Sequence, residues 1–259
     1  MGAVHGVHLK YVAVSALCAW CAHHIGPDED RVAPWRALLV YSALIHGLFA
    51  GLFVLQSGMQ LLGKSMETGT LPWWSYLLWW PFHTFSWLYT YMHTIQSERH
   101  GIPVASEVAP GWWIGGRYAN WLPGNRQWAA TIDLTCEFPE SCLNSTTRYL
   151  LLRCWDGVPP RPEEIEEAAV LASMAANGKP GDCGDIMVHC AHGRGRSTTV
   201  MVACLVRAGV HSDWQTAFEA VKRNRPVCRL NTKMRNVLRE WQARYGTTPY
   251  RVRLGDWSS

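Results

Sequence analysis

Charged side chains are distributed very unevenly along this chain, and this restricts how the chain can fold more than any other feature. Of the 24 Lys and Arg residues and the 20 Asp and Glu residues, only four of each kind lie before residue 98. The remaining 20 basic and 16 acidic residues account for the net charge of +4. A charge-poor part followed by an ordinarily charged part predicts a membrane-associated helical segment over residues 1–97 and a soluble domain over residues 98–259.

Two long runs in the first part contain no charged residue. One covers residues 37–63 and the other residues 68–97. A helix of roughly 20 apolar residues crosses the hydrocarbon core of a bilayer, so we expect transmembrane helices at about residues 37–62 and 71–95. Trp and Tyr residues are spread along the second run, and two alternatives stay open. Either this run lies in the membrane interface, or both runs form a buried helical hairpin of a soluble domain.

The charges that flank these runs predict the orientation of the protein. If both runs span the membrane, the N-terminus and the C-terminal domain lie on the same side. The connector at residues 63–69 holds one Lys and one Glu, whereas the other side carries Lys10, Arg31, Arg36 and Arg99. Cytoplasmic loops carry an excess of Lys and Arg. The prediction is a multi-pass membrane protein with two helices and a C-terminal domain that faces the cytoplasm.

The nine cysteines agree with a reducing compartment. Their number is odd, their spacing is irregular and several lie inside apolar runs, which is not the pattern of a secreted disulfide framework. Reduced thiols are typical of the cytosol or of an organelle that is kept reducing. One group in the N-terminal segment has the chemistry of metal ligands, but we interpret it as structural: Cys18, Cys21, His23 and His24.

The C-terminal part alternates short apolar strands with capped helices. Strands are expected at residues 111–116, 129–134, 149–154 and 184–189. Helices are expected at residues 162–177 and 198–208, then after a cap at Ser212, and from a cap at Asn231 to residue 245. This alternation predicts an α/β fold with a mainly parallel sheet flanked by helices.

The segment from His189 to Ser197 joins the last of these strands to a helix through a glycine-containing loop. Loop N–H groups and the free N–H groups at a helix start form a cradle for an anion such as a phosphate dianion. Gly193 and Gly195 let the backbone turn where a side chain would obstruct it. Cys190 stands at the mouth of this cradle, where the same field stabilises a thiolate. A thiolate that faces a bound phosphoryl group is a nucleophile.

Other residues of this loop have roles that follow from the same interpretation. The planar guanidinium of Arg196 can hold two phosphoryl oxygens and neutralise charge in the transition state. The hydroxyl of Ser197 can donate a hydrogen bond to the sulfur of Cys190 and help it to leave. The side chains of His192 and Arg194 can add positive charge at the mouth. We therefore expect the substrate phosphate to be bound by His189, Ala191, His192, Gly193, Arg194 and Gly195.

With these motifs the sequence resembles the protein-tyrosine/dual-specificity phosphatase superfamily over about residues 101–245. The likeness rests on His-Cys-x-x-Gly-x-x-Arg-Ser in the loop, on residues 110–116, on Ile132-Asp-Leu-Thr, and on Arg223-Asn-Arg-Pro followed by Leu230-Asn231. It is closest to the small dual-specificity type. The resemblance implies a cysteine-phosphatase fold, a two-step reaction through a phosphocysteine, and no metal ion or other cofactor.

The resemblance also assigns a general acid, because this family supplies the proton from an aspartate on a loop upstream of the cysteine. Asp156 follows an expected strand, lies 34 residues before Cys190 and is flanked by glycine and proline. A bound dianion and a thiolate disfavour a second negative charge, which keeps such a carboxyl protonated in part. After proton transfer, Asp156 can act as base on the attacking water. The open alternative is an ordinary loop aspartate.

One further implication concerns oxidation. In the branch of this superfamily that hydrolyses phosphoinositides, a cysteine at the end of a similar strand forms a disulfide with the nucleophile. Cys136 is at such a position, so one interpretation is that mild oxidation links Cys136 and Cys190 reversibly. The open alternative is an unpaired cysteine beside the core. Cys154 and Cys183 are the other candidates for this resolving thiol.

These features predict a cysteine-dependent phosphatase that acts on phosphotyrosine, phosphoserine or phosphothreonine proteins at a membrane. A phosphoinositide or other phospholipid is the alternative substrate, because a membrane anchor and a basic run suit a polyanionic lipid. The run consists of Lys222, Arg223, Arg225 and Arg229. A phosphate-binding scaffold without turnover is a further alternative. We expect no nucleic-acid partner, since aromatic residues do not interleave with this run.

Overall fold

The computed structural model describes residues 6–25, 33–124, 126–177, 184–246 and 248–249. The flanking Arg31 and the thiol candidate Cys183 lie outside these residues. The N-terminal part is helical, as expected, and contains five elements. These are α1 (Val7–His24), α2 (Ala33–Leu55), the short 3₁₀ helix η1 (Met59–Leu62), α3 (Trp73–Leu78) and α4 (Trp80–Arg99).

The C-terminal part contains a five-stranded sheet in the order β1-β2-β5-β3-β4. Only the edge pair β1–β2 is antiparallel, and the other neighbours are parallel, which confirms the expected mainly parallel sheet. The central strand β5 lies between β2 and β3, with Val188 opposite both Ile114 and Ile132. The strands are β1 (Ala105–Ala109), β2 (Trp112–Gly115), β3 (Trp128–Asp133), β4 (Thr146–Leu151) and β5 (Ile186–His189).

The four expected helices are present, with small differences at their ends. They are α5 (Pro162–Ala176), α6 (Arg196–Arg207), α7 (Trp214–Asn224) and α8 (Thr232–Tyr245). Asn231 caps α8 by accepting the N–H of Met234, as expected. The cap of α7 is Asp213 rather than Ser212, because the Asp213 carboxylate accepts the N–H of Thr216.

Two expectations about strands were incomplete. Strand β1 was missed, because Ala105–Ala109 has little of the aliphatic character that marks the other strands. Strand β4 begins and ends three residues earlier than residues 149–154, because its pairing with β3 starts at Thr146 and ends at Leu151. Residues 152–155 therefore lie outside the strand, between the end of β4 and Asp156.

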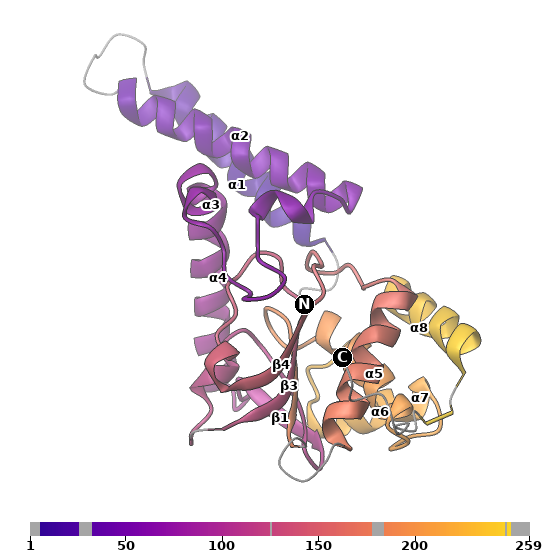
Figure 1. The fold of residues 1–259 in the computed structure, drawn as a ribbon. Helices are drawn as coiled ribbons and strands as arrows, with labels where there is room; N and C mark the ends of the chain where they lie inside the picture. The colour runs from indigo at the N-terminus through magenta and orange to yellow at the C-terminus, as the bar shows by residue number, and fades with distance from the viewer. Residues whose placement is uncertain (1–5, 26–32, 125, 178–183, 247, 250–259) are drawn as a thin grey trace.

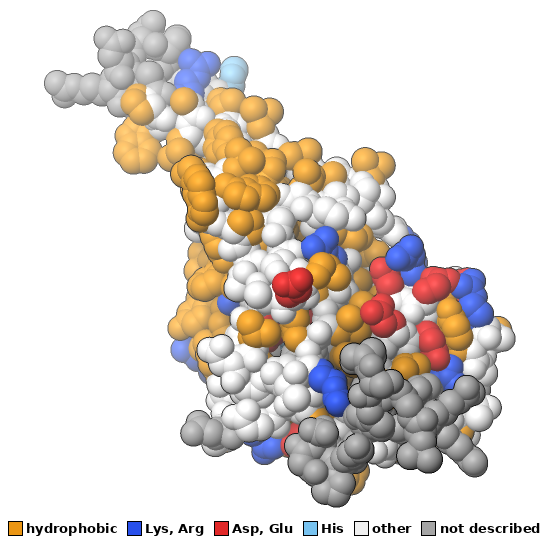
Figure 2. Space-filling view, in the orientation of Figure 1, with side chains coloured by type: hydrophobic (Ala, Val, Ile, Leu, Met, Phe, Trp, Pro, Cys, Tyr) orange, Lys and Arg blue, Asp and Glu red, His pale blue; other side chains and the backbone are white. Residues whose placement is uncertain are grey.

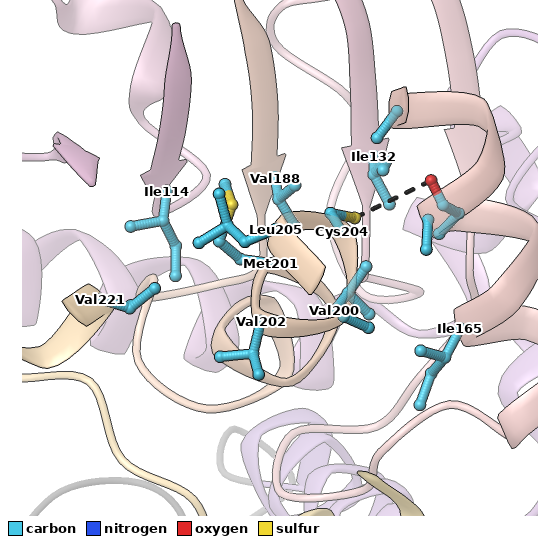
Figure 3. Packing of buried hydrophobic residues seen from close by; sticks show 14 of the residues in the cluster. Ile114, Ile132, Ile165, Val188, Val200, Met201, Val202, Cys204, Leu205 and Val221 are labelled. Carbon is cyan, nitrogen blue, oxygen red and sulfur yellow. Dashed lines mark hydrogen bonds between the residues drawn. The ribbon is translucent and has the colours of Figure 1, made fainter. Parts of the chain in front are cut away.

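Helices α5–α8 lie on one side of the sheet and α4 runs along the other side (Figure 1). The main core forms where α6 crosses the central strands. Figure 3 shows Val200, Met201 and Leu205 of α6 near Val188 of β5 and Ile114 of β2. Every residue of α6 is buried, so this helix and the loop before it are held in a fixed position under the carboxyl end of β5.

Helices α1 and α2 run antiparallel and project from the rest of the molecule as a hairpin (Figure 1). Figure 2 shows hydrophobic side chains gathered on this hairpin and on the adjoining α3–α4 edge. Among the described residues, Pro34–Leu55 alone is long and apolar enough to cross a membrane, and more of its apolar window is exposed than buried. The first expected span thus has a matching helix.

The second expected span at residues 71–95 was wrong as a single transmembrane helix. The helix is interrupted at Trp79. Helix α3 ends before this residue, and α4 begins after it with Pro81 in its first turn. Helix α4 then packs against the C-terminal domain, where Tyr91 meets Tyr118 and Trp121, and Trp87 lies over the guanidinium of Arg117 at 4.4 Å. A topology with two spans from these runs is therefore not supported.

The N-terminal helices and the C-terminal domain share a second hydrophobic cluster. Trp155, from the loop after β4, is fully buried among Phe49, Phe53 and Phe82. Its ring lies 4.6 Å from that of Phe53, and its indole N–H donates to the carbonyl of Ser57 at 2.7 Å. The packing therefore continues across residue 98, and the domain boundary expected there stays a prediction.

Candidate active site

The loop from Cys190 to Gly195 lies at the carboxyl end of the central strand. The backbone N–H of Cys190 donates to the carbonyl of Gly115 at 3.3 Å. Gly193 has a φ of +65°, and a Cβ there would come within 2.5 Å of the Gly115 carbonyl carbon, so no other residue fits. The guanidinium of Arg225 donates to the carbonyl of Gly193 at 2.9 Å. Arg225 is buried and holds the loop, and so it is not part of an exposed basic run.

Cys190 and Ser197 face each other across the loop, with 3.4 Å between Sγ and Oγ. Burial by itself raises the pKa of a thiol. The positive charge of Arg196 and the hydrogen bonds from Ser197 outweigh that effect, and the pKa of Cys190 is lowered from its ordinary value. The geometry thus supports the expected reactive thiolate and the expected partner for it.

Arg196 is fully buried and connects the ends of two strands. Its Nη1 donates to the carbonyls of Leu134 at 2.7 Å and Cys154 at 2.6 Å. Its Nη2 forms an ion pair with Glu137 at 2.8 Å and lies 3.6 Å from the carboxylate of Asp156. Two carboxylates and two carbonyls therefore hold the guanidinium, and its charge acts on the Cys190 sulfur.

Asp156 lies close enough to this guanidinium to share the site. Its side chain is 16% exposed. Burial raises the pKa of Asp156, and although Arg196 and Lys10 oppose this shift, the net change is upward. A carboxyl that holds its proton longer than usual is suited to act as a general acid. The neighbouring Trp155, anchored among the N-terminal helices, fixes where the Asp156 loop begins.

His192 and Arg194 both meet helix α4. The ring of His192 lies 4.4 Å from that of His93, and Arg194 donates to the hydroxyl of Ser97 at 3.2 Å. Burial and the nearby His93 ring lower the pKa of His192 well below its ordinary value. The imidazole is therefore neutral near pH 7, and of these two residues only Arg194 brings positive charge to the mouth.

His189 points away from the phosphate cradle into a buried polar network. Its Nε2 lies 2.6 Å from Glu140 and 3.9 Å from Asp133. Burial alone would lower the pKa of His189, but these two carboxylates raise it to about 9. On the other side, the ammonium group of Lys64 pairs with Asp133 and donates to the carbonyl of Thr135 at 2.9 Å.

This network supports the loop from below and does not fit a metal ion. The ligand atoms of Asp133, Glu140 and His189 lie within 4.8 Å of one another, which a cation could bridge. However, the ammonium of Lys64 already neutralises Asp133, and His189 is protonated near pH 7, so its ring nitrogen donates to Glu140. The charges of the group are balanced by the chain itself.

Sequence reasoning missed three residues of the site: Lys10, Lys64 and Glu137. Lys10, on α1, lies over the ring of Tyr89 at 4.2 Å, and that ring in turn meets His192. The sequence did contain a signal for Glu137, because this residue closely follows the expected strand at residues 129–134. The carboxyl end of that strand, β3, lies beside the carboxyl end of β5 in the parallel sheet. Lys10 and Lys64 gave no such signal, since both belong to the segment interpreted as a membrane anchor.

Cys136 is buried beside this site with a reduced thiol. Its Sγ lies 3.6 Å from the carbonyl of Cys154 and 3.5 Å from the carboxylate of Glu137. Burial raises the pKa of Cys136 well above its ordinary value. The disulfide between Cys136 and Cys190 stays a prediction.

The sheet order, the loop and the groups around it agree with the cysteine-phosphatase fold expected from the sequence. Dual specificity protein phosphatase 15 of Rattus norvegicus is 30% identical over a match that covers 44% of this chain and 52% of that protein. The chain thus spans about half the length of this curated relative. No protein-family model matches the chain. The chain is thus similar in sequence to a dual-specificity protein phosphatase, in agreement with the expected resemblance.

Solved structures with a similar fold include human DUSP28 and PTPMT1 in complex with PI(5)P. The first is 19% identical, with a TM-score of 0.45, over 55% of this chain and 95% of that one. The second is 18% identical, with a TM-score of 0.44, over 54% of this chain and 96% of that one.

The pair of Lys64 and Asp133 gives a stability prediction. Replacing Lys64 by Met leaves a buried carboxylate without its partner, and we expect the free energy of unfolding to fall by about 3–5 kcal/mol. The control Lys222→Met removes an exposed ammonium group and should change stability by less than about 0.5 kcal/mol. Urea unfolding of the detergent-solubilised full chain, followed by tryptophan fluorescence, measures both.

The double variant Lys64→Met with Asp133→Asn removes the unpaired charge and should recover part of the loss. Equal stabilities of Lys64→Met and Lys222→Met would show that the N-terminal segment does not hold the strand end through this pair.

Proposed function

We propose that this protein is a cysteine-dependent phosphatase that hydrolyses phosphate monoesters through a phosphocysteine intermediate. The observation that carries the proposal is the convergence of Cys190, Arg196 and Asp156 at the mouth of one glycine-containing loop. The lowered pKa of the thiol and the raised pKa of the carboxyl match the two roles, which need a thiolate and a protonated acid together.

In the first step, the thiolate of Cys190 attacks phosphorus, and the bond from phosphorus to the ester oxygen breaks. Asp156 gives its proton to that oxygen, so the leaving group departs as an alcohol. The guanidinium of Arg196, already fixed by Glu137, neutralises charge on the transferring phosphoryl oxygens.

In the second step, water attacks the phosphocysteine, and the Asp156 carboxylate accepts a proton from that water. The bond from sulfur to phosphorus breaks and releases inorganic phosphate. The Ser197 hydroxyl, 3.4 Å from Sγ, stabilises the returning thiolate by donating a hydrogen bond. The proximity of a thiol, an arginine and a carboxyl supports an enzyme over a scaffold that only binds phosphate.

The proposed setting is a membrane surface, with phosphorylated protein or phospholipid as substrate and the domain facing the cytoplasm. The candidate anchor is the α1–α2 hairpin, since it projects from the domain and Pro34–Leu55 is long and apolar enough to span a bilayer. If α1 enters the bilayer together with α2, both ends of the hairpin lie on the side of the catalytic domain.

Replacement of Cys190 by Ser removes the nucleophile but leaves the loop N–H groups and Arg196. We expect turnover of p-nitrophenyl phosphate to fall by at least ~10⁴-fold, while an inorganic phosphate analogue such as tungstate still binds. The control Cys21→Ser changes a half-buried cysteine on α1 and should retain activity. Substantial turnover by Cys190→Ser would assign the nucleophile elsewhere.

Replacement of Asp156 by Asn separates the roles of nucleophile and acid. Alkyl phosphates should lose ~10²–10⁴ in rate, whereas aryl phosphates with stable phenoxide leaving groups should lose much less. The alkaline fall of kcat/KM should also disappear, because it reports deprotonation of the acid. The control Asp185→Asn alters a carboxylate on the surface. Equal losses on both substrates would exclude Asp156 as the acid.

Membrane attachment is tested by alkaline carbonate extraction of the full chain. The wild-type chain should stay in the pellet. A variant with Leu44→Lys and Leu48→Lys should be released, because each charge near the middle of a spanning helix costs about 2.5–3.5 kcal/mol. Release of the wild-type chain would instead support a hairpin that is not inserted in the bilayer.

A further inference from the structure

A pocket of about 420 Å³ adjoins the candidate general acid. One wall is formed by Asp156 and the two residues after it. The other walls are the beginning of α1, the end of α2 and the beginning of α8. A general acid must lie within hydrogen-bond distance of the oxygen to which it gives its proton. A leaving group protonated by Asp156 therefore has this pocket beside it.

The walls of the pocket combine apolar and cationic side chains. Val7, Phe53, Val54 and Val158 are apolar, whereas His8 and Lys233 bring cationic or protonatable groups. Phe53 is held in place by its contact with Trp155 at 4.6 Å between ring centroids. Such a lining suits a leaving group that has both an anionic part and an apolar part.

The apolar side of this pocket continues along the hairpin. Phe53 and Val54 lie in the last turn of α2, the helix that can cross a membrane. Val54 is exposed, Val40 is exposed on the same face four turns earlier, and the exposed Leu44 lies one turn from Val40. An acyl chain that leaves the pocket along this face remains on apolar surface as far as the bilayer.

Lys10 of α1 and helix α4 cover the catalytic loop at His192 and Arg194. Lys10 and Tyr89 lie together above His192, and Arg194 is bonded to Ser97 of α4. Cys190 is only 3% exposed. A phosphorylated polypeptide would need open surface on both sides of its side chain, and the side at His192 and Arg194 is occupied. A single headgroup that enters through the pocket beside Asp156 does not meet that obstacle.

Resting on the phosphatase chemistry proposed above, we infer that the substrate is a glycerophospholipid whose headgroup ends in a phosphate monoester. The monoester binds in the catalytic loop, and the remaining headgroup with its phosphodiester occupies the pocket beside Asp156 near His8 and Lys233. The acyl chains lie along the exposed face of α2. The hairpin is then a wall of the substrate site as well as an anchor.

The test compares substrates on the full chain in detergent micelles. The lipids are dioleoyl phosphatidylglycerophosphate and a dioleoyl phosphatidylinositol monophosphate, which distinguish a glycerol from an inositol headgroup. Glycerol 3-phosphate, an inositol monophosphate, p-nitrophenyl phosphate and a phosphotyrosine peptide are the soluble comparisons. We expect kcat/KM for at least one lipid to exceed that of its headgroup by ~100-fold, as expected for contact with about four methylene groups.

Variants of the exposed Val54 test whether the preference for lipid arises from contact with the end of α2. Val54→Asn should lower the ratio of kcat/KM for the lipid to that for p-nitrophenyl phosphate by at least ~10-fold, mainly through KM. Val54→Leu keeps an apolar side chain and should keep the wild-type ratio. The control Val210→Asn changes an exposed valine in the turn after α6 and should leave the ratio unchanged.

Three results would overturn the inference while the phosphatase proposal stands. These are equal kcat/KM for a lipid and its headgroup, a preference for the phosphopeptide, and a ratio that Val54→Asn and Val210→Asn change alike. Absence of Cys190-dependent turnover on every substrate, p-nitrophenyl phosphate included, would instead remove the phosphatase proposal and this inference with it.

Discussion

The buried guanidinium of Arg196 is the interaction on which the rest of the site depends. It is bonded to the carbonyls that follow β3 and β4, to the carboxylate of Glu137, and lies beside Asp156. A buried cation needs such compensation, because its desolvation is costly. The arrangement also lowers the pKa of Cys190. One charge thereby joins the strand ends, favours the thiolate of Cys190 and lies beside the loop that carries Asp156.

Lys64 is the buried cation that stabilises the end of β3 beneath the loop. It extends from the N-terminal segment to Asp133 at the end of β3, and Asp133 in turn lies near the protonated His189. The carbonyl of Lys64 also accepts a hydrogen bond from Arg153 at 2.6 Å. Together with the burial of Trp155 among Phe49 and Phe53, these bonds make the helical segment part of the catalytic framework. Loss of the segment would expose both apolar surface and uncompensated charge.

Local sequence patterns were sufficient to predict the central elements of the C-terminal domain. The apolar run before Cys190 gave β5, the apolar run after Arg196 gave α6, and Asn231 marked the start of α8. These elements follow from hydrophobic periodicity and capping, which act within a few residues. Strand β1 was missed because its residues have little β-propensity and it forms only by pairing with β2.

The sequence by itself determined the loop between β5 and α6, its thiol and its arginine, because one strand, one glycine-containing turn and one helix start are contiguous along the chain. The tertiary structure alone decided that Glu137 holds Arg196, that Lys64 neutralises Asp133 and that Lys10 lies beside the site. It also decided that α4 covers the domain instead of crossing a bilayer. These contacts join residues that are far apart in the sequence, and apolar or charged character does not specify a partner until packing brings the groups together.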